Sequence, residues 1–319
     1  MSKQIVALDP GFGNTKVVAN GRVSIIQSVV ARPVEIGYAA TGLKSARDCI
    51  EVGFGNHHFV VGQGAWRRGE PLSSMDYTAL SSPARKSLFY AGLAELFSPG
   101  KYEIDYLVIG LPVPLLQDEL QAEMIFRSLR AYKGMHTFVV DGEPYRFLVR
   151  LGKRLAQPVG TWADWLLNDD LHIRKGGGQA EVAVLDIGMN TLDLYVIQGG
   201  EVFDRYLGGD KVGVRRLLEV MNGSGKDIEE LDYSLRTGKL KPTDEELEIW
   251  LGKILSELDD RWPKMKRFTA VIPTGGGAAV LGEHLRQALV AKGAAVHWPE
   301  NPIAANAIGL WKWGSRELR

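Results

Sequence analysis

Hydrophobic and polar positions repeat one pattern in the two halves of the chain. The first copy has apolar runs at residues 4–9, 15–19 and 22–27. The second copy has apolar runs at residues 181–186, 190–197 and 201–206. In both copies a glycine-containing turn separates the first two runs, and Asn20-Gly21 or Gly199-Gly200 predicts a tight hairpin before the third. We therefore expect each half to begin with a three-stranded antiparallel meander.

The later parts of the two halves also correspond. Buried strands are predicted at residues 105–113 and 268–273, followed by helices over 115–132 and from Thr274 onward. Further strands at 145–151 and 294–298 lead into closing helices, where the sequences QPVG and NPIA place a proline near the helix start. Each half thus has the predicted order β-β-β-α-β-α-β-α.

The segments between these shared elements differ, which predicts two similar cores with unlike outer subdomains. Residues 28–100 include a hairpin-like stretch at 51–66, whereas residues 208–265 are largely helical and charged. A length of 319 residues suits two domains of roughly 150 residues each. We predict domain I over residues 1–155 together with the C-terminal helix 302–319, and domain II over 156–301.

Composition restricts the partners of the chain. Lys plus Arg and Asp plus Glu both number 38, so no overall charge favours nucleic acid or a membrane surface, and we expect direct binding to neither. Cys49 is the single cysteine, which excludes an intramolecular disulfide and a cysteine-rich zinc site. The N-terminus enters a strand at once and no run of about 18 uncharged apolar residues follows, so we expect a soluble, cytoplasmic protein.

The repeated turns carry the clearest candidate chemistry. Asp9 and Asp186 each end an apolar run and begin the sequences DPGFGNT and DIGMNT. Glycines at 11, 13 and 188 permit close approach of the backbone to a ligand, and successive N–H groups in such a turn bind phosphate oxygens. An aspartate beside phosphate is better suited to holding Mg²⁺ through water molecules. Either turn alone reads as an ordinary β-turn, but the matching pair indicates a metal-nucleotide site.

Two further glycine-rich segments are weaker candidates. Thr274 and Gly275–Gly277 follow a strand and begin a helix, which suits an anionic or planar ligand but also an ordinary strand-helix connection. Gly208, Gly209 and Asp210 precede another helical segment and give a still less specific indication of nucleotide contact.

Taken together, DPGFGNTK, QPVGT, DIGMNTLD, TGGG and NPIAANAIG resemble the five nucleotide-site segments of the actin, Hsp70 and sugar-kinase superfamily. Within it, the LPV segment at 111–113 and DIGMNTLDLYVI resemble the ParM-type plasmid-segregation and archaeal actin-like ATPases most. The resemblance implies an α/β actin-like ATPase fold, with two duplicated ribonuclease-H-like domains and inserted outer subdomains around a nucleotide cleft. It also implies ATP or GTP with Mg²⁺ as the bound cofactors.

The resemblance further implies roles for individual residues. Asp9 and Asp186 match the phosphate-loop aspartates near the metal, Lys16 matches a phosphate-contacting lysine, and Gln157 falls near the position that orients the attacking water. The implied nucleotide contacts are Asp9, Gly11, Gly13, Asn14, Thr15, Lys16, Gly188, Asn190, Thr191, Gly209, Asp210, Gly275, Gly276 and Gly277. ParM-type proteins carry Glu where Gln157 falls, and an amide is a poor general base. Gln157 as a plain polar residue at a helix start stays open as the alternative.

Three functions follow as hypotheses. The first is an ATPase that polymerises head to tail, serving a cytoskeleton or plasmid segregation through an adaptor protein. The second is a small-molecule, sugar-type kinase, for which Asp105 or Asp118 would be the candidate base. The third is a non-polymerising regulator or chaperone, which the lack of a peptide-binding segment after the last predicted helix disfavours.

Overall fold

The computed structural model describes residues 3–34, 48–72, 80–113, 119–222 and 225–319. The chain divides into two compact units, residues 1–155 with Leu318 and residues 156–317 with Arg319. Asp118 and the beginning of the helix predicted over 115–132 lie outside the described residues.

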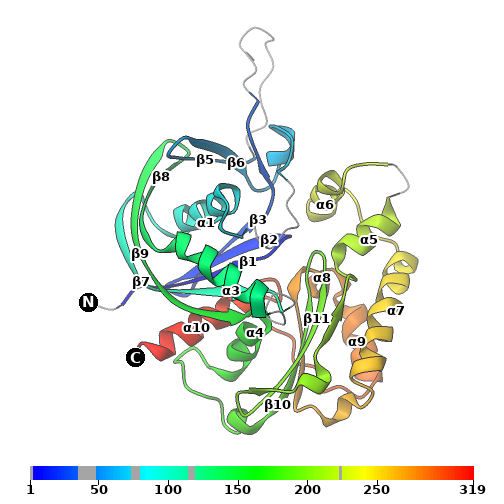
Figure 1. Ribbon diagram of the computed structural model, residues 1–319. Helices are drawn as coiled ribbons and strands as arrows, with labels where there is room; N and C mark the ends of the chain where they lie inside the picture. The colour runs from blue at the N-terminus through cyan, green and yellow to red at the C-terminus, as the bar shows by residue number, and fades with distance from the viewer. Residues whose placement is uncertain (1–2, 35–47, 73–79, 114–118, 223–224) are drawn as a thin grey trace. The chain divides into compact units, whose positions relative to one another are not determined.

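The first unit is built on one sheet of nine strands (Figure 1). Its strands are β1 (Ile5–Pro10), β2 (Asn14–Ala19), β3 (Arg22–Gln27), β4 (Val30–Ala31), β5 (Ile50–Phe54), β6 (His57–Val61), β7 (Gly100–Leu111), β8 (Gly134–Val140) and β9 (Glu143–Ala156). Their order in the sheet is β3-β2-β1-β7-β9-β8-β5-β6-β4. The predicted meander of β1, β2 and β3 is confirmed, and β7 adds to β1 in parallel.

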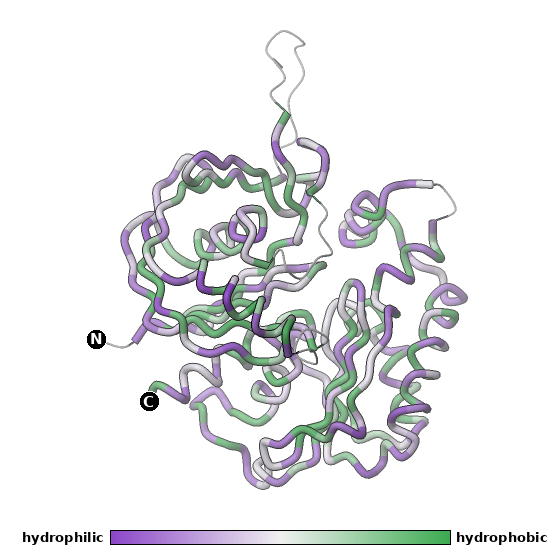
Figure 2. Tube along the Cα trace, in the orientation of Figure 1, coloured by the Kyte–Doolittle hydropathy of each residue, from purple (hydrophilic) through white to green (hydrophobic). Residues whose placement is uncertain are grey.

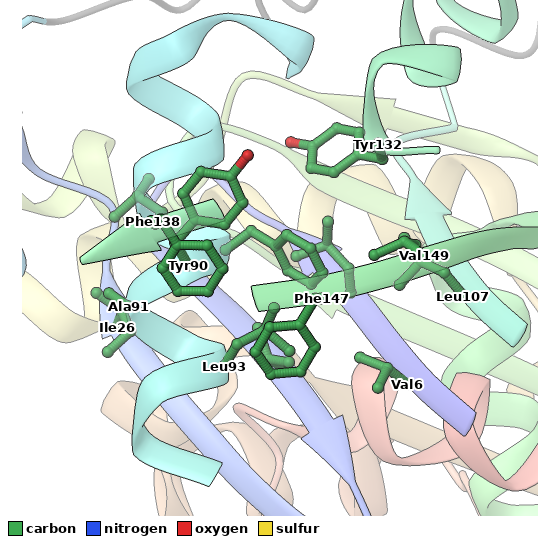
Figure 3. Packing of buried hydrophobic residues seen from close by; sticks show 14 of the residues in the cluster. Val6, Ile26, Tyr90, Ala91, Leu93, Leu107, Tyr132, Phe138, Phe147 and Val149 are labelled. Atoms are coloured by element: carbon green, nitrogen blue, oxygen red, sulfur yellow. The ribbon is translucent and has the colours of Figure 1, made fainter. Parts of the chain in front are cut away.

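Helix α1 (Pro83–Leu96) lies inside the curve of this sheet (Figure 1). Ser82 caps the helix by accepting from the backbone N–H of Arg85, and Pro83 suits its first turn. Gly92 lets the helix approach the sheet, because a Cβ there would lie 2.5 Å from Cγ2 of Val17. Aromatic rings fill the space between helix and sheet, with Tyr90 stacked on Phe138 at a centroid distance of 4.2 Å (Figure 3).

The second unit repeats the central frame of the first. Its strands are β10 (Glu181–Ile187), β11 (Leu192–Gln198), β12 (Glu201–Val202), β13 (Gly208–Asp210) and β14 (Ala270–Thr274). The order β12-β11-β10-β14, with β10 and β14 parallel, matches β3-β2-β1-β7 in the first unit. The duplication predicted from the hydrophobic pattern is therefore confirmed at the level of strand order and direction.

Helices cover both faces of this second sheet. They are α4 (Gln157–Leu166), α5 (Val214–Met221), α6 (Ile228–Arg236), α7 (Asp244–Arg261), α8 (Gly275–Leu281), α9 (Glu283–Ala291) and α10 (Ala305–Glu317). Trp250 and Trp262, from the helical insertion, are fully buried in the core that the sheet shares with α5, α7 and α9. Exposed polar positions of α7 alternate with the buried Leu247, Trp250 and Ile254. The central strands are largely hydrophobic (Figure 2). The charged insertion is thus an amphipathic layer over the sheet.

Several elements differ from the sequence prediction. The predicted strand at 201–206 ends at Val202, and a 3₁₀ turn over Asp204–Tyr206 follows it. The predicted strand at 294–298 is reduced to a single parallel bridge between Val271 and Val296. The helix that begins after Thr274 breaks at Gly282, whose φ of +51° interrupts the helical geometry.

Other differences concern how the elements associate. The sequence pattern gave no indication of β8, through which the inserted β5–β6 hairpin joins the main sheet rather than standing apart. The described part of the helix predicted over 115–132 consists of α3 (Glu119–Ser128) and a 3₁₀ turn over Leu129–Tyr132. Helix α10, which we predicted with domain I, belongs to the second unit because it packs along α4. Among the described residues, no helix combines the length and apolar character needed to cross a membrane.

Candidate functional site

The first repeated turn connects β1 to β2 and places Asp9 directly opposite Lys16 across the two strands. Lys16 Nζ lies 2.9 Å from Asp9 Oδ2, and the Asp9 side chain is fully buried. The two residues that we predicted as metal-facing and phosphate-contacting are therefore ion-paired with each other. This pair neutralises the acidic charge at the base of the first turn.

Ser28, at the end of β3, fixes the backbone of this turn. Its hydroxyl donates to the Gly11 carbonyl at 2.6 Å, and its backbone N–H donates to the Gly13 carbonyl at 3.0 Å. Because a trans peptide directs C=O and the next N–H to opposite sides, the N–H groups of Phe12 and Asn14 point away from Ser28. The turn thus holds two amides on one side, as a phosphate-binding nest requires. Ser28 was not among the predicted site residues.

Gly11 is required at its position in the turn. A Cβ there would lie 2.7 Å from the Asn14 carbonyl oxygen and 3.1 Å from Lys16 Nζ. Both contacts are closer than real Cβ atoms tolerate without a shift of the neighbouring atoms. Thr15, another predicted contact, exchanges a hydrogen bond of 2.9 Å with the Ser28 hydroxyl, so it also supports the turn.

Arg85, in the first turn of α1, adds a positive charge beside the same loop. Its guanidinium carbon lies 4.9 Å from the ring centre of Phe12, and Nη1 is 3.5 Å from the Gly11 carbonyl oxygen. Burial lowers the pKa of Arg85 from its ordinary value. Nothing in the local sequence connects Arg85 with the turn, since the contact arises only when α1 packs against the sheet.

The second repeated turn is held from behind by the start of α5. Gly188 N–H donates to the Thr191 carbonyl at 2.8 Å and closes the turn. The carbonyls of residues 188–190 accept from the amides of Val214, Arg215 and Gly213 at 3.0, 2.8 and 3.3 Å respectively. The N–H groups of residues 189–191 consequently point away from α5. Both turns therefore present amides outward, although different elements hold their carbonyls.

An aspartate replaces the lysine at the corresponding position of the second unit. Asp193 stands opposite Asp186 in the register of β10 and β11, as Lys16 stands opposite Asp9. Burial raises the pKa of Asp193 to about 7, and the neighbouring Asp186 charge adds to the rise. The Thr191 hydroxyl, which donates to Asp193 Oδ2 at 2.9 Å, opposes that rise. Two adjacent buried carboxyl groups make this turn the more favourable one for a cation.

Asp186 is also held by residues from α10 and α4. Asn306 Nδ2 donates to Asp186 Oδ2 at 2.7 Å, and Asn306 Oδ1 accepts from the Thr161 hydroxyl at 2.7 Å. All three side chains are buried. Thr161 and Asn306 lie in the predicted segments QPVGT and NPIAANAIG, but neither was among the predicted site residues. A polar residue within a mostly apolar stretch of each helix was the available signal.

The glycines after β14 have distinct structural roles. Gly275 has a φ of +88°, and a Cβ there would lie 2.6 Å from Asp186 Oδ1 and closer still to the Ile187 carbonyl. A Cβ at Gly277 would overlap the Ile187 side chain. Gly276 is different, because a Cβ there would meet no atom within 4 Å. Packing of α8 against the end of β10 explains two of the three glycines and leaves Gly276 unexplained.

Three other predicted site residues, Gln157, Gly209 and Asp210, lie in different surroundings. Gln157 is the buried first residue of α4, one helical turn before Thr161. Gly209 packs beside Asp193, with an added Cβ 3.3 Å from Asp193 Oδ1. Asp210 is exposed, and its carboxylate accepts from the N–H of Lys211.

The donor set near Asp186 fits magnesium bound through water molecules better than direct ligation. Within the described residues, no cluster of three or more His, Cys, Asp or Glu side chains is arranged to hold a metal ion. Asn306 engages only one oxygen of Asp186, and Mg²⁺ commonly keeps several waters while using one or two carboxylates. In the first unit, the charge of Asp9 is already matched by Lys16.

Comparisons with known proteins agree with this geometry. Residues 7–160, just under half of the chain, match the family model of the N-terminal domain of actin-like proteins. Solved structures of actin-like proteins also match over nearly the full length of the chain. The chain has the actin-like fold. No curated protein sequence matches it.

Three solved structures illustrate the similarity of this actin-like chain to known proteins. The psk41 ParM protein has a TM-score of 0.74 at 17% identity, covering 100% of this chain and 98% of that one. The archaeal actin homolog Ta0583 has a TM-score of 0.73 at 21% identity, covering 98% and 99%, and was also solved in complex with ADP. A 15-stranded ParM filament from Clostridium botulinum has a TM-score of 0.73 at 19% identity, covering 99% and 100%.

Proposed function

We propose that this actin-like chain binds and hydrolyses ATP or GTP with Mg²⁺. The observation that carries the proposal is that both units contain the same Asp-x-Gly turn, with its carbonyls accepting hydrogen bonds from Ser28 in the first unit and from the start of α5 in the second. The N–H groups that follow those carbonyls are thereby directed to the opposite side. Amides arranged in this way bind phosphate oxygens without a dedicated lysine loop. The solved ADP complex of Ta0583 supports a nucleotide as the ligand of this fold.

The two turns suit different parts of a metal-nucleotide because their side-chain charges differ. The first turn, with Lys16 and Arg85 beside it, is suited to phosphate oxygens. The second turn, with Asp186 and Asp193, is suited to the hydrated metal ion, which would neutralise charge developing on the phosphates. Gln157 would orient the attacking water through its amide. Because an amide cannot accept a proton as a carboxylate does, we expect slow turnover.

We further propose that the nucleotide controls assembly of the chain into head-to-tail filaments. The C. botulinum ParM and Alp12, both similar in fold, were solved as filaments. Contacts that join unlike surfaces of successive copies do not close into a ring and therefore generate filaments. An adaptor protein would link such a filament to plasmid DNA or other cargo in the cytoplasm.

The sugar-type kinase remains the weaker candidate. Asp105, nominated as its base, accepts from the Gln4 N–H at 2.9 Å and precedes the parallel pairing of Tyr106 with Ile5. Asp9 lies beyond the other end of that pairing, about four residues or roughly 13 Å along the strand. Asp105 therefore does not lie next to the first turn.

Assembly is tested by electron microscopy and pelleting of the purified chain with a non-hydrolysable ATP analogue, with ADP and without nucleotide. We expect filaments with the analogue and few with ADP. Absence of filaments across salt, pH and nucleotide, together with phosphate transfer to sugars, would support the kinase instead. Nucleotide binding without either activity would support a non-polymerising regulator.

Gly276 provides a separate test of nucleotide binding. Gly276→Ala adds a methyl group that meets no protein atom, so folding should be unaffected or slightly improved. If the nucleotide lies against α8, the methyl group should weaken its binding about 10-fold or more, as measured with a fluorescent ATP analogue. Gly252→Ala is the matched control, because it is also helical and also meets no atom within 4 Å. Equal affinities in the two variants would remove Gly276 from the nucleotide site.

A further inference from the structure

Three buried polar side chains connect helix α4 to the end of β10 through α10. Thr161 donates to Asn306 at 2.7 Å, and Asn306 donates to Asp186 at 2.7 Å. The exposed fractions are 1% for Thr161, 5% for Asn306 and 6% for Asp186. Buried hydrogen bonds of this kind are costly to leave unmade, so the chain fixes the geometry of its members.

The direction of this chain is determined by its two ends. A carboxylate offers only acceptors, so Asn306 must turn its NH₂ group toward Asp186. The amide oxygen then faces Thr161, whose hydroxyl supplies the donor. Thr161 also lies 3.2 Å from the Thr274 hydroxyl, but Thr274 donates its own proton to the Pro302 carbonyl at 2.8 Å. Thr274 can therefore accept from Thr161 but not donate to it, and the shorter bond of Thr161 is the one to Asn306. Asp186 thus sets the orientation of the Asn306 amide, and Thr161 supports it.

The helices that carry these residues are held in unusually close contact. A Cβ at Gly309 of α10 would lie 1.7 Å from the Gly160 carbonyl oxygen of α4, and a Cβ at Gly160 would lie 2.1 Å from the Asn306 carbonyl oxygen. The absence of both side chains therefore brings the Asn306 backbone against the turn of α4 that contains Thr161. Such packing leaves little freedom for the Asn306 side chain.

The same contacts define where the Asp186 carboxylate points. Asn306 holds Oδ2, while Oδ1 occupies space that a side chain at Gly275 would need. Gln157 and Thr161 are four residues apart on α4 and lie on the same helix face. The hydrogen-bonded chain thus runs from the helix of the predicted water-orienting residue to the predicted metal-facing carboxylate.

We propose that Asn306 is a positioning residue that sets Asp186 relative to Gln157 for hydrolysis, with Thr161 acting through Asn306. This inference rests on the proposed function, since it assigns Asn306 a role in that reaction. Partners that orient a metal-facing carboxylate in this way affect metal affinity and turnover without touching the substrate. Asn306 contributes in this manner to catalysis and not to nucleotide affinity.

A double-mutant cycle with Asn306→Ala and Thr161→Val tests the proposal. Asn306→Ala should lower kcat about 10- to 100-fold and raise the Mg²⁺ concentration needed for half-maximal activity. Thr161→Val keeps the side-chain shape and should lower kcat less. Because Thr161 acts only through Asn306, the double variant should match Asn306→Ala alone. Independent, multiplying losses would overturn the positioning role.

Binding and stability measurements distinguish positioning from a purely structural effect. In EDTA, all variants should bind a fluorescent ATP analogue as the wild type does, and Mg²⁺ should strengthen binding less in Asn306→Ala than in the wild type. Ala307→Gly, also buried in α10, is the control for loss of helix stability and should keep the wild-type Mg²⁺ dependence. If that control loses kcat as Asn306→Ala does, helix stability explains the effect and the proposal fails.

The outcome for the wild type separates this inference from the proposed function. A wild-type chain that binds no nucleotide would overturn both. A wild-type chain with Mg²⁺-dependent hydrolysis that Asn306→Ala leaves unchanged would overturn only the role of Asn306.

Discussion

Replacing Asp186 with alanine is expected to abolish nucleotide hydrolysis while leaving the second unit folded. The carboxylate faces a proposed hydrated Mg²⁺, and metal stabilisation of charge in the transition state is worth several kcal/mol, so a loss of roughly 10³-fold or more follows. Removing the Asp186 carboxylate also removes its repulsion of Asp193, which is one of the two causes that raise the pKa of Asp193. Relief of this repulsion between the two carboxylates offsets part of the free-energy cost of leaving Asn306 Nδ2 without its acceptor.

The measurement is phosphate release by the full chain, with thermal unfolding as the check on folding. We expect a midpoint close to that of the wild type and filaments with ATP that persist, because the hydrolysis that weakens them is lost. Asp260→Ala is the matched control, since this carboxylate is exposed near the end of α7 and belongs to none of the predicted site segments. Hydrolysis at the wild-type rate in Asp186→Ala would exclude Asp186 from the reaction.

The sequence was sufficient to predict the duplicated frame because hydrophobic alternation and turn residues are local signals. The runs around Asp9 and Asp186 form the predicted strands, and the glycines between them form the predicted turns. What supports those turns was not predictable in the same way. Ser28 holds one turn and the start of α5 holds the other, and such contacts depend on tertiary packing.

The side-chain partners of the site were missed for the same reason. Asn306 contacts Asp186 from 120 residues further along the chain. Its position within an apolar helix therefore did not indicate which residue it would contact. Arg85 meets the first turn only after α1 enters the curve of the sheet. Weak elements also failed: residues 294–298 alternate as a strand would, yet they make only one bridge, because the run is short and lies beyond β14 at the sheet edge.

The two halves of the chain carry different residues at one pair of equivalent positions, which gives the two turns different electrostatic roles. Lys16 faces Asp9 in the first unit, and Asp193 faces Asp186 in the second. The first turn therefore has no net charge from this pair of positions and tolerates phosphate, whereas the second concentrates negative charge and favours a cation. Under the proposed function, a duplicated backbone with unlike cross-strand partners would separate phosphate binding from metal binding.

Lys16→Met is expected to reduce both stability and nucleotide affinity. The substitution keeps most of the aliphatic stem but leaves the fully buried Asp9 carboxylate without its cation. Removing one partner of a buried ion pair lowers the free energy of unfolding by about 3–5 kcal/mol. The first unit should therefore unfold at a clearly lower denaturant concentration. Arg127→Met is the control, because its exposed pair with Glu123 should contribute less than about 1 kcal/mol.

A second variant separates the two effects of Lys16. Asp9→Asn combined with Lys16→Met removes both charges and leaves no buried ion unpaired, so most of the lost stability should return. Nucleotide affinity should stay low, because the positive charge beside the first turn is still absent. Recovery of both stability and affinity in the double variant would show that Lys16 serves only to neutralise Asp9. Stability that returns while affinity does not would place the lysine charge in phosphate binding, with Asp9 holding it in position beside Gly11.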